Sequence, residues 1–317
     1  MGRSQTIHQV LAALESAPLS IAPQPSSALC IRPAHPSDKD AVLAFCSHTW
    51  DDQKDYIDSV WDRWLADDRS IMLVATLNSI PVAMGRGLLV GDREAWLEGI
   101  RVDRRYRRQG IFRQLEAKLY DYLQKHSARV CRTCIASNNE VMTAIALRSN
   151  YRVVTPYTIY SGPSITSPSI SSPPIFSQAR TLCPSSESEI NQWSDRQSTA
   201  PLYVYRGAKW QALTAEQLGK LQQRDRLWSF HYNGKFTGLF VQSEMENPDG
   251  SLWVGLCDVW GHEAVFYQEL RRLSDRLGFQ SVSGFFPADT RLHAILLRAG
   301  YRRSIPFQYI VYQCQIG

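Results

Sequence analysis

The sequence lacks the long apolar runs and the dense cysteines that mark membrane and secreted proteins. No stretch of its 317 residues approaches the roughly 18 consecutive apolar residues of a membrane span, and no apolar signal core precedes Pro23. The seven cysteines are an odd number without the close spacing of a disulfide scaffold, which indicates reduced thiols. We therefore expect a cytoplasmic protein that has no membrane partner.

A strong excess of charge and a metal-binding pattern are also missing. The chain has 35 basic and 30 acidic side chains, a net charge of +5, and no nucleic-acid motif accompanies its basic cluster between Arg101 and Arg113. Cys131 and Cys134 form a C-x-x-C pattern, but they lie in a predicted strand, where residues three apart point to opposite faces. Because no second ligand pair accompanies these cysteines, we expect no metal site. Because no nucleic-acid motif accompanies the basic cluster, we expect no nucleic-acid partner.

What is present predicts an α/β domain in the first half of the chain. The length fits about two average domains, and an apolar content of 44% suffices for two cores. The expected strands cover residues 29–32, 71–77, 82–90, 94–102 and 129–136, with two more from residue 151 and around 157–160. The expected helices cover residues 38–48, 56–65 and 139–149, and a longer helix follows residue 110.

The most informative segment is the basic loop that precedes this longer helix. Residues 95–102 alternate bulky apolar and other side chains, as in a half-buried strand. Downstream, an apolar stripe has helical spacing: Ile111, Leu115, Leu119, Tyr122 and Leu123. Gly110 thus stands at a helix N-terminus, where the first amides lack intrahelical partners and the helix dipole is positive. A glycine that admits close backbone approach, within an arginine-rich loop, predicts a cradle for phosphates.

The spacing Arg107-x-x-Gly110-Ile111, after a strand that ends Ile100-x-Val102, resembles the acetyl-CoA signature of GNAT-type acetyltransferases. The resemblance implies that amides of this loop bind the pyrophosphate of acetyl-CoA. Phe112 stands where the family usually has Gly or Ala, which implies a less close approach of the backbone. The resemblance implies no metal site. It implies that the cofactor is bound by Ile100, Arg101, Val102, Arg107, Arg108, Gln109, Gly110, Ile111, Phe112, Asn138 and Asn139.

The two asparagines belong to a second part of the resemblance, at the end of the fifth expected strand. There the family has an Asn that precedes a helix, so Asn139, or Asn138 one step earlier, is implied to hydrogen-bond the CoA arm. The alternative is that Asn138 simply caps the helix. Asn150 takes the place of the family's Gly at the C-terminus of the helix. After Gly, Asn is the residue that adopts the left-handed conformation most readily.

The second half of the chain repeats the first. Residues 147–152 (LRSNYR) match residues 297–302 (LRAGYR), and the stripe Phe266, Leu270, Leu273 and Leu277 repeats that of the long helix. No Arg-x-x-Gly loop precedes this second stripe. We predict two tandem GNAT-like α/β (α+β) domains, each a mixed, mostly antiparallel sheet flanked by helices. The divisions are an N-terminal extension (1–27), a GNAT acetyltransferase domain (28–160), a Ser/Pro linker (161–174) and a degenerate GNAT-like domain (175–317).

The chemistry that the resemblance implies is direct attack of an amine on the acetyl-CoA thioester. A backbone N–H of the splayed strand, at Ile100 or near it, is then the oxyanion donor. Glu98, in the same strand, is the candidate base, and the alternative is an ordinary surface or ion-paired carboxylate. In a regular strand Glu98 shares a face with Trp96 and Ile100, and a bulge would change that parity. In this family a Tyr often protonates the leaving thiolate, but Ala146 stands at that position, so the sequence offers no candidate for the general acid.

The acceptor is expected against the first two helices. Residues 48–56 join them with aromatics and carboxylates that suit an ammonium. With Trp61 and Trp64 behind it, this stretch faintly resembles acetyltransferases that act on free amino acids such as histidine. The alternative is a solvated turn with both tryptophans as core anchors.

Three functions fit these observations. The first is an acetyl-CoA-dependent N-acetyltransferase, an acyltransferase acting on a small-molecule amine, possibly a free amino acid. The second is a protein lysine or N-terminal acetyltransferase, and the third is a non-catalytic acyl-CoA-binding module. We expect a monomer or a homodimer.

Overall fold

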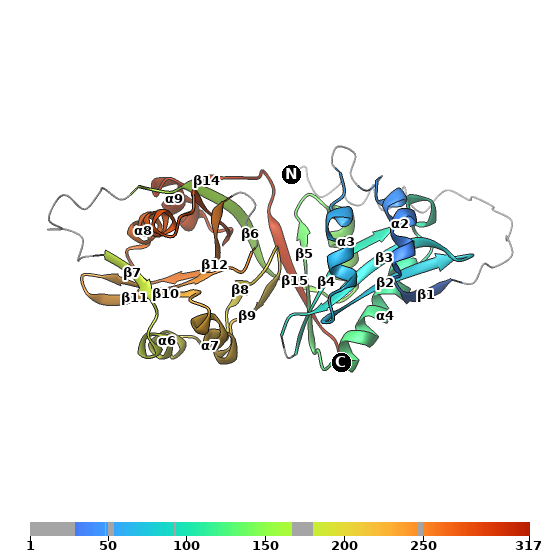
Figure 1. Ribbon diagram of the computed structural model, residues 1–317, viewed down its shortest axis with the longest axis horizontal. Helices are drawn as coiled ribbons and strands as arrows, with labels where there is room; N and C mark the ends of the chain where they lie inside the picture. Colours follow the sequence, from blue (N-terminus) through green and yellow to red (C-terminus); the bar gives the residue numbers. More distant parts are fainter. Residues whose placement is uncertain (1–28, 48, 50–53, 92, 167–179, 246–249) are drawn as a thin grey trace, which may run out of the picture.

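Two lobes lie side by side in the computed structural model, which describes residues 29–47, 49, 54–91, 93–166, 180–245 and 250–317 (Figure 1). The first lobe contains β1 (Cys30–Pro33), η1 (Pro36–Asp38), α2 (Lys39–Cys46), α3 (Ile57–Leu65), β2 (Ser70–Leu77), β3 (Ile80–Leu89), β4 (Glu94–Val102), η2 (Arg104–Tyr106), α4 (Ile111–Lys125), β5 (Val130–Ala136), α5 (Glu140–Arg148) and β6 (Arg152–Pro163). The expected extension 1–27 lies outside the described residues.

The second lobe repeats this order with three short extra strands, β8, β9 and β14. It contains β7 (Arg180–Pro184), α6 (Glu187–Ser194), β8 (Leu202–Val204), β9 (Trp210–Ala212), α7 (Ala215–Gln223), β10 (Leu227–Tyr232), β11 (Lys235–Gln242), β12 (Ser251–Val259), α8 (Glu263–Arg276), β13 (Ser281–Pro287), α9 (Thr290–Arg298), β14 (Arg302–Arg303) and β15 (Tyr309–Gln315). The architecture is therefore the mixed, mostly antiparallel α/β fold that the sequence predicts.

Corresponding turns confirm the internal repeat. Asn78 and Ser79 join β2 to β3 with positive φ angles of 51° and 67°, and Asn233 and Gly234 join β10 to β11 with 50° and 73°. Such left-handed pairs match the twist of the strands in a two-residue hairpin. After α5, Asn150 has a φ of 61°, as expected for a helix-closing residue, and Gly300 after α9 has 85°.

One sheet runs through both lobes because the two halves exchange their last strands. The order is β1-β2-β3-β4-β5-β15-β6-β13-β12-β11-β10-β7 in a 13-stranded sheet, with β14 beside β6. The C-terminal strand β15 thus lies between β5 and β6, and β6 pairs along Tyr157 to Pro163 with β13 of the second lobe. Figure 1 shows β15 crossing into the first lobe, where the chain ends beside α4. A sheet edge left unpaired in one half is covered by the other.

The exchange extends β6 further than the sequence suggests. A single strand, Arg152–Pro163, replaces the two short strands expected from residue 151 and around 157–160, and its last residues fall in the expected linker 161–174. Pairing of Ser161 and Gly162 with β13 accounts for this, and Pro163 is tolerated because it ends the strand. Residues 167–174 of that linker lie outside the described residues.

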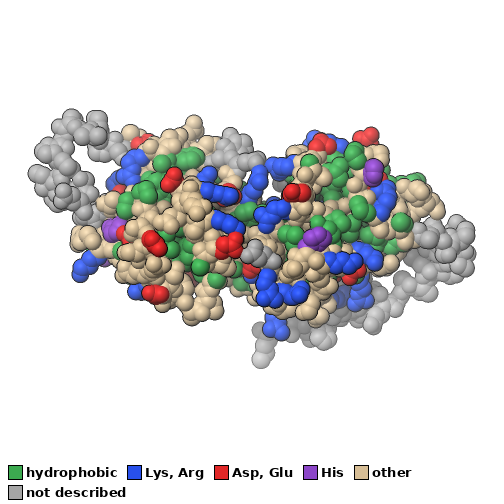
Figure 2. All heavy atoms as spheres, turned by 60° about the horizontal axis from the view of Figure 1, so that its bottom comes forward, with side chains coloured by type: hydrophobic (Ala, Val, Ile, Leu, Met, Phe, Trp, Pro, Cys, Tyr) green, Lys and Arg blue, Asp and Glu red, His purple; other side chains and the backbone are tan. Residues whose placement is uncertain are grey.

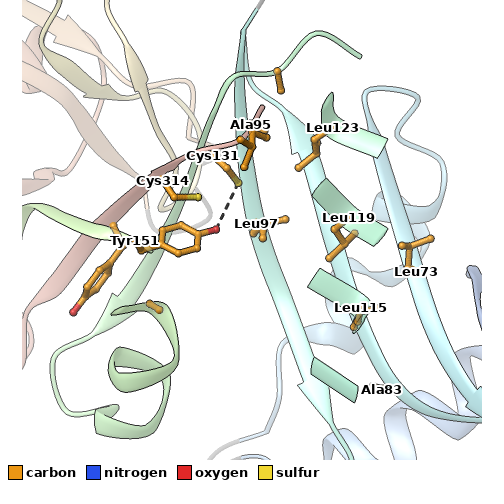
Figure 3. Close-up of a cluster of buried hydrophobic side chains, with 14 of the residues drawn as sticks. Leu73, Ala83, Ala95, Leu97, Leu115, Leu119, Leu123, Cys131, Tyr151 and Cys314 are labelled. Atoms are coloured by element: carbon orange, nitrogen blue, oxygen red, sulfur yellow. Dashed lines mark hydrogen bonds between the residues drawn. The ribbon is translucent and has the colours of Figure 1, made fainter. Parts of the chain in front are cut away.

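The helix α4 packs on one face of the first lobe's sheet, with the predicted stripe turned inward. Ile111, Leu115, Leu119 and Leu123 are buried, and Tyr122 packs against them (Figure 3). The same cluster includes Tyr312, Cys314 and Ile316 from the end of the chain. In the second lobe Phe266, Leu270 and Leu273 are buried, but Leu277 is 39% exposed because α8 ends at Arg276. Residues from the C-terminus thus complete the core around α4.

A second apolar cluster joins the lobes on the opposite face. Leu88, Val90 and Trp96 of the first half pack there with Val204, Trp210, Phe285 and Val311 of the second. Trp210 stacks on Trp96 with ring centroids 6.0 Å apart. Cys131 lies in the α4 cluster and Cys134 in this one, so the C-x-x-C residues do point to opposite faces. The lobes therefore share a core and a sheet.

Candidate acyl-transfer site

The predicted phosphate cradle forms the connection from β4 to α4. Asp103 begins η2 by accepting a hydrogen bond from the Arg105 amide at 3.0 Å, and Arg105 Nη2 pairs with Asp103 at 2.7 Å. Gly110 then caps α4 in the left-handed conformation, with a φ of 75°. A Cβ at Gly110 would meet nothing within 4 Å, so the space beside this backbone is open. The exposed first-turn amides of α4 and the helix dipole face that space and suit an anion.

Positive side chains surround the cradle. Arg107, Arg108 and Gln109 are exposed, and the Arg107 Nε donates to the Val102 carbonyl at 3.1 Å, which holds the loop against the end of β4. The first turn of α4 contains no acidic residue. Among the side chains coloured in Figure 2, basic and acidic groups alternate rather than forming one continuous basic stripe. The cradle concentrates positive charge at a helix N-terminus, which is the arrangement that several phosphates require.

A bulge in β4 lies upstream of the cradle. The register against β3 shifts between Arg86↔Glu98 and Met84↔Arg101, so two residues of β4, Gly99 and Ile100, face one position of β3. Gly99 has a φ of 66°, and a Cβ there would lie 2.5 Å from the Trp64 ring, so only glycine fits. A bulge leaves the extra backbone amide unpaired in the ladder. An N–H freed in this way would lie at or near Ile100, where the oxyanion donor is predicted.

The bulge also reverses the side-chain parity expected for a regular strand. Ile100 packs with the α4 cluster, whereas Glu98 lies on the other face with Trp96 and Arg101. The strand is therefore not regular, and the alternative with a bulge describes it: the inserted residue shifts the alternation by one, so Glu98 and Ile100 do not share a face.

A pocket of about 830 Å³ opens where β4 and β5 separate. The parallel pairing of these strands runs from Glu94↔Val130 to Trp96↔Arg132, and the pocket begins beyond it. Its lining comes from several elements of both lobes: Lys54, Tyr56, Val60, Arg63, Trp64, Trp96, Leu97, Glu98, Gly99, Ile100, Arg101, Thr133, Cys134, Ile135, Ala136, Asn138, Asn139, Met142, Ala208, Lys209, Phe307 and Tyr309. The second lobe thus closes one wall of a pocket built on the bulge.

Glu98 is the one carboxylate among these lining residues, and two cations hold it. Its Oε1 pairs with Nη1 of Arg86, which stands opposite on β3, and its Oε2 lies 3.0 Å from Nζ of Lys209. Arg86 is only 3% exposed and also pairs with Asp67, donates to Ser70 Oγ at 3.1 Å and lies 4.9 Å over the Trp64 ring. Such bonds to charged partners fix the carboxylate in place at the pocket wall.

Arg101, one of the residues predicted to bind the cofactor, pairs its guanidinium with Asp55. Its Nε and Nη2 donate to the two carboxylate oxygens at 2.8 and 3.2 Å, and its Nη1 donates to the Ile100 carbonyl at 3.1 Å. Asp55 is 7% exposed and also accepts from the Ile57 amide at 3.2 Å. The guanidinium lies 5.2 Å from the Tyr56 ring, and burial raises the pKa of the Tyr56 hydroxyl. This pair tethers α3 to the strand that carries the bulge.

The two asparagines have different positions. Asn139 caps α5 by accepting a hydrogen bond from the Met142 amide at 3.1 Å, so the cap is Asn139 and not Asn138. Asn138 is exposed at the pocket rim. Of the two, Asn138 keeps its side-chain amide available for a ligand.

The expected acceptor stretch is described only in part. His48 and residues 50–53 lie outside the described residues, whereas Lys54 and Tyr56 line the pocket. Trp61 is fully buried in the core beneath α3, as the alternative reading holds, and Trp64 both packs in that core and reaches the pocket.

Three pocket-lining residues, and the buried arginine that pairs with Glu98, were not foreseen from the sequence. The role of Arg86 depends on the strand register that places it opposite Glu98. Lys209, Phe307 and Tyr309 come from the second half of the chain. No local pattern marks the last three, because the strand exchange and the docking of the β8–β9 turn bring them to the first lobe.

The second copy has no comparable cradle. The turn before α8 places Gly261 and His262 at φ angles of 73° and 59°, but Glu263 follows in the first turn and pairs with Arg291 at 2.9 Å. A carboxylate at a helix N-terminus repels phosphate, so the N-terminus of α8 does not suit a phosphate ligand.

Neither a metal-binding group nor a membrane-spanning helix is present among the described residues. The described residues include no group of three or more His, Cys, Asp or Glu side chains that could hold a metal ion. None of the described helices is long and apolar enough to cross a membrane.

These features define a two-lobed α/β protein with a basic loop and an open glycine before a helix, next to a bulged strand. Residues 40–149 match the model of the Acetyltransferase (GNAT) family, and this part of the chain is similar to members of that family. A comparison with curated proteins found no match.

Solved structures share the fold across nearly the whole chain. The GCN5-related N-acetyltransferase from Sphaerobacter thermophilus superposes with a TM-score of 0.59 at 16% identity over 91% of this chain and 96% of its own. A tandem GNAT protein from the clavulanic acid biosynthesis pathway gives a TM-score of 0.52 at 14% identity over 92% and 99%. A glucosamine N-acetyltransferase region in a fungal multi-domain β-N-acetylglucosaminidase gives 0.60 at 12% identity over 94% of this chain and 40% of that one. The tandem GNAT architecture that the sequence predicts is thereby supported at the level of fold.

Proposed function

We propose that the protein is an acetyl-CoA-dependent N-acetyltransferase that transfers an acetyl group to the amine of a small molecule such as a free amino acid. The observation that carries this proposal is the succession along one strand: the carboxylate Glu98, the bulge at Gly99 and Ile100, and the cradle that ends at Gly110. Acetyl-CoA bound with its pyrophosphate on the cradle would direct its thioester toward the opening between β4 and β5.

Acetyl transfer needs a donor for the oxyanion, a base for the attacking amine and a proton for the leaving thiolate. The amide freed by the bulge would stabilise the oxyanion of the tetrahedral intermediate. Glu98, the carboxylate of the pocket lining, would accept the proton of the attacking amine, directly or through a water. Ala146 occupies the position at which the family often has its acidic Tyr, so the thiolate would take its proton from solvent or another group.

The walls of the pocket favour a small acceptor over a protein. Lys209, Phe307 and Tyr309 close the side toward the second lobe, and Tyr56 and Trp64 close the side toward α3. A pocket of about 830 Å³ is in the range of sites for small ligands. A peptide would need an open groove that runs past the thioester.

The test is CoA thiol release from acetyl-CoA with a panel of amino acids, polyamines, aminoglycosides and peptides. We expect turnover with at least one free amine of low mass. Turnover with peptides alone would support the protein acetyltransferase alternative. Tight CoA binding without thiol release for any acceptor would support a binding module.

A further inference from the structure

We propose that Lys209 is itself an acetyl acceptor, so that the protein acetylates its own pocket in an intramolecular reaction. This inference rests on the proposed acetyltransferase function. It adds a modification site, supplied by the second lobe, to the site of the first.

The placement of the lysine carries the proposal. Lys209 Nζ lies 3.0 Å from Oε2 of Glu98, the proposed base, and its side chain is 16% exposed. It lines the same pocket as the bulge residues Gly99 and Ile100. The ε-amine therefore occupies the place beside Glu98 that an acceptor amine would have to take.

The turn that carries Lys209 is held firmly against the first lobe. The Tyr205 amide donates to the Lys209 carbonyl at 3.1 Å, which closes the turn between β8 and β9. The next residue, Trp210, is fully buried and lies between Trp96 and Tyr157 with ring centroids 6.0 and 4.9 Å away. Holding an amine near a bound thioester converts a bimolecular reaction into an effectively unimolecular one, which favours transfer to this residue.

Lys209 completes the charge balance around Glu98. Arg86 pairs with Oε1 of Glu98 from the opposite strand and also with Asp67, so one cation is shared by two carboxylates. Lys209 supplies the second cation, at Oε2 of Glu98, and lines the pocket. Its ammonium therefore takes the position on this carboxylate that the ammonium of an incoming acceptor would take.

The reaction balances without any further reagent. The Lys209 ammonium gives one proton to Glu98, and the resulting amine adds to the thioester carbonyl of acetyl-CoA. The attacking nitrogen loses its second proton as the tetrahedral intermediate breaks its C–S bond, which forms an amide on Nζ, and the departing CoA thiolate takes up that proton, directly or through water. Glu98 returns its proton to water, so one proton, one CoA thiol and one acetyllysine are formed for each acetyl-CoA consumed.

Acetylation would change the pocket for the next acceptor. It removes the positive charge of Lys209 and leaves Oε2 of Glu98 without its cation. An incoming acceptor ammonium would then meet a carboxylate rather than another ammonium. We therefore expect a slow first phase of turnover with a small amine, which prior incubation with acetyl-CoA abolishes.

The experiment incubates the full-length protein with acetyl-CoA in the absence of acceptor and follows it by intact mass and peptide mass spectrometry. We expect one acetyl group per chain, located on Lys209, and a rate constant that does not change with protein concentration. Lys209→Arg keeps the cation beside Glu98 and should abolish the modification. Lys220→Arg, in an exposed pair with Glu216 on α7, is the matched control and should leave it unchanged.

The outcomes separate this proposal from the proposed function. If the protein binds acetyl-CoA and acetylates a free amine while Lys209 stays unmodified, the inference is wrong and the function stands. Equal modification of Lys209 in a Gly110→Val protein, or a rate that rises with protein concentration, would also overturn it, since either result indicates acetylation outside the site. Failure to bind acetyl-CoA would overturn both.

Discussion

Two glycines of the first lobe show how single residues define the site. Gly99 and Gly110 both have positive φ angles, 66° and 75°, but for different reasons. Gly99 is enclosed, because a Cβ there would meet Trp64, whereas Gly110 faces open space. The first shapes the strand, and the second leaves room for a ligand.

Gly110→Val should therefore weaken acetyl-CoA binding through the ligand rather than through a protein clash. The added side chain would stand where the pyrophosphate approaches, and we expect a loss on the order of 2 kcal/mol, roughly 30-fold in Kd, by calorimetric titration. Backbone strain of about 1–3 kcal/mol is also expected, since valine disfavours positive φ.

A matched variant separates these two effects. Gly261, before α8, has a φ of 73° and equally open surroundings but stands beside no phosphate cradle. Gly261→Val should lose similar stability and keep acetyl-CoA affinity. Equal affinities in the two variants would remove the cradle from the proposed site.

Glu98→Gln tests the proposed base. The amide keeps the shape of the carboxylate but cannot accept the proton, so the chemical step should fall by about 10²–10⁴-fold with little change in acetyl-CoA binding. Part of the rate should return as the pH rises, because the free amine needs no base. The measurement is turnover of a working acceptor from about pH 6 to about pH 10. Equal rates in both proteins over that range would make Glu98 a structural partner of Arg86 and Lys209.

Among the elements, α4 joins the ligand site to the core. It begins at the cradle and buries its apolar stripe against the sheet, but it also buries Glu116, which is 7% exposed. Ser149 Oγ donates to one oxygen of Glu116 at 3.0 Å and Tyr120 OH to the other at 3.2 Å. Burial is the main cause that raises the pKa of this carboxyl above its ordinary value of 4.5, and the two hydrogen bonds act against it.

The raised pKa of Glu116 gives a pH dependence of stability with a definite sign. The folded state binds the proton more tightly than the unfolded state, so the contribution is fully present below the unfolded pKa and is lost as the pH rises through the folded pKa. Glu116→Gln removes this loss and can retain the hydrogen bonds. We expect its melting temperature, relative to the native chain, to increase from about pH 4 to about pH 8.

The control is Glu216→Gln, which removes an exposed carboxylate about half accessible to solvent. Its melting temperature relative to the native chain should change little over the same range. A difference for Glu116→Gln that does not vary with pH would contradict the buried-carboxyl account.

At the scale of the whole molecule, the two lobes are folded into each other. β15 pairs with β5 along its full length, from Tyr309↔Ala136 to Gln315↔Val130. It carries Tyr312 and Cys314 of the α4 core, and Ile316 follows it directly. Arg132 adds a polar link, since it donates to Gln313 at 2.7 Å and to Glu94 at 2.9 Å, and Glu94 accepts from the Ala212 amide at 2.8 Å. Neither range predicted as a domain therefore contains a complete sheet.

This arrangement predicts what cutting the chain will do. A chain that ends at Pro163 lacks β15, so β5 and β6 each lose a neighbour, and we expect it to be insoluble or unfolded when produced alone. A full chain cut by a protease site placed within residues 167–179 should instead remain one particle in size-exclusion chromatography, with acetyl-CoA binding intact. Separation of the two fragments without denaturant would contradict the exchange.

The local chemistry of the first lobe follows from the sequence alone. The strand, basic loop, glycine and apolar stripe around Gly110 are consecutive in the chain, and each depends on backbone preferences and periodicity that act over a few residues. For the same reason the hairpins at Asn78 and Asn233 and the left-handed Asn150 are predictable. The internal repeat is visible because both copies retain the same local signals.

Only the tertiary structure decides which residues meet in the pocket. The bulge that turns Ile100 away from Glu98 depends on the fit of Gly99 against Trp64, and the partners of Glu98 come from an opposite strand and from the other lobe. The exchange of β6 and β15 depends on pairing between segments about 150 residues apart, which backbone hydrogen bonds stabilise without any sequence signature of their own. The sequence determined that a basic loop and a left-handed glycine stand before a helix, and the fold determined which lysine stands beside the carboxylate.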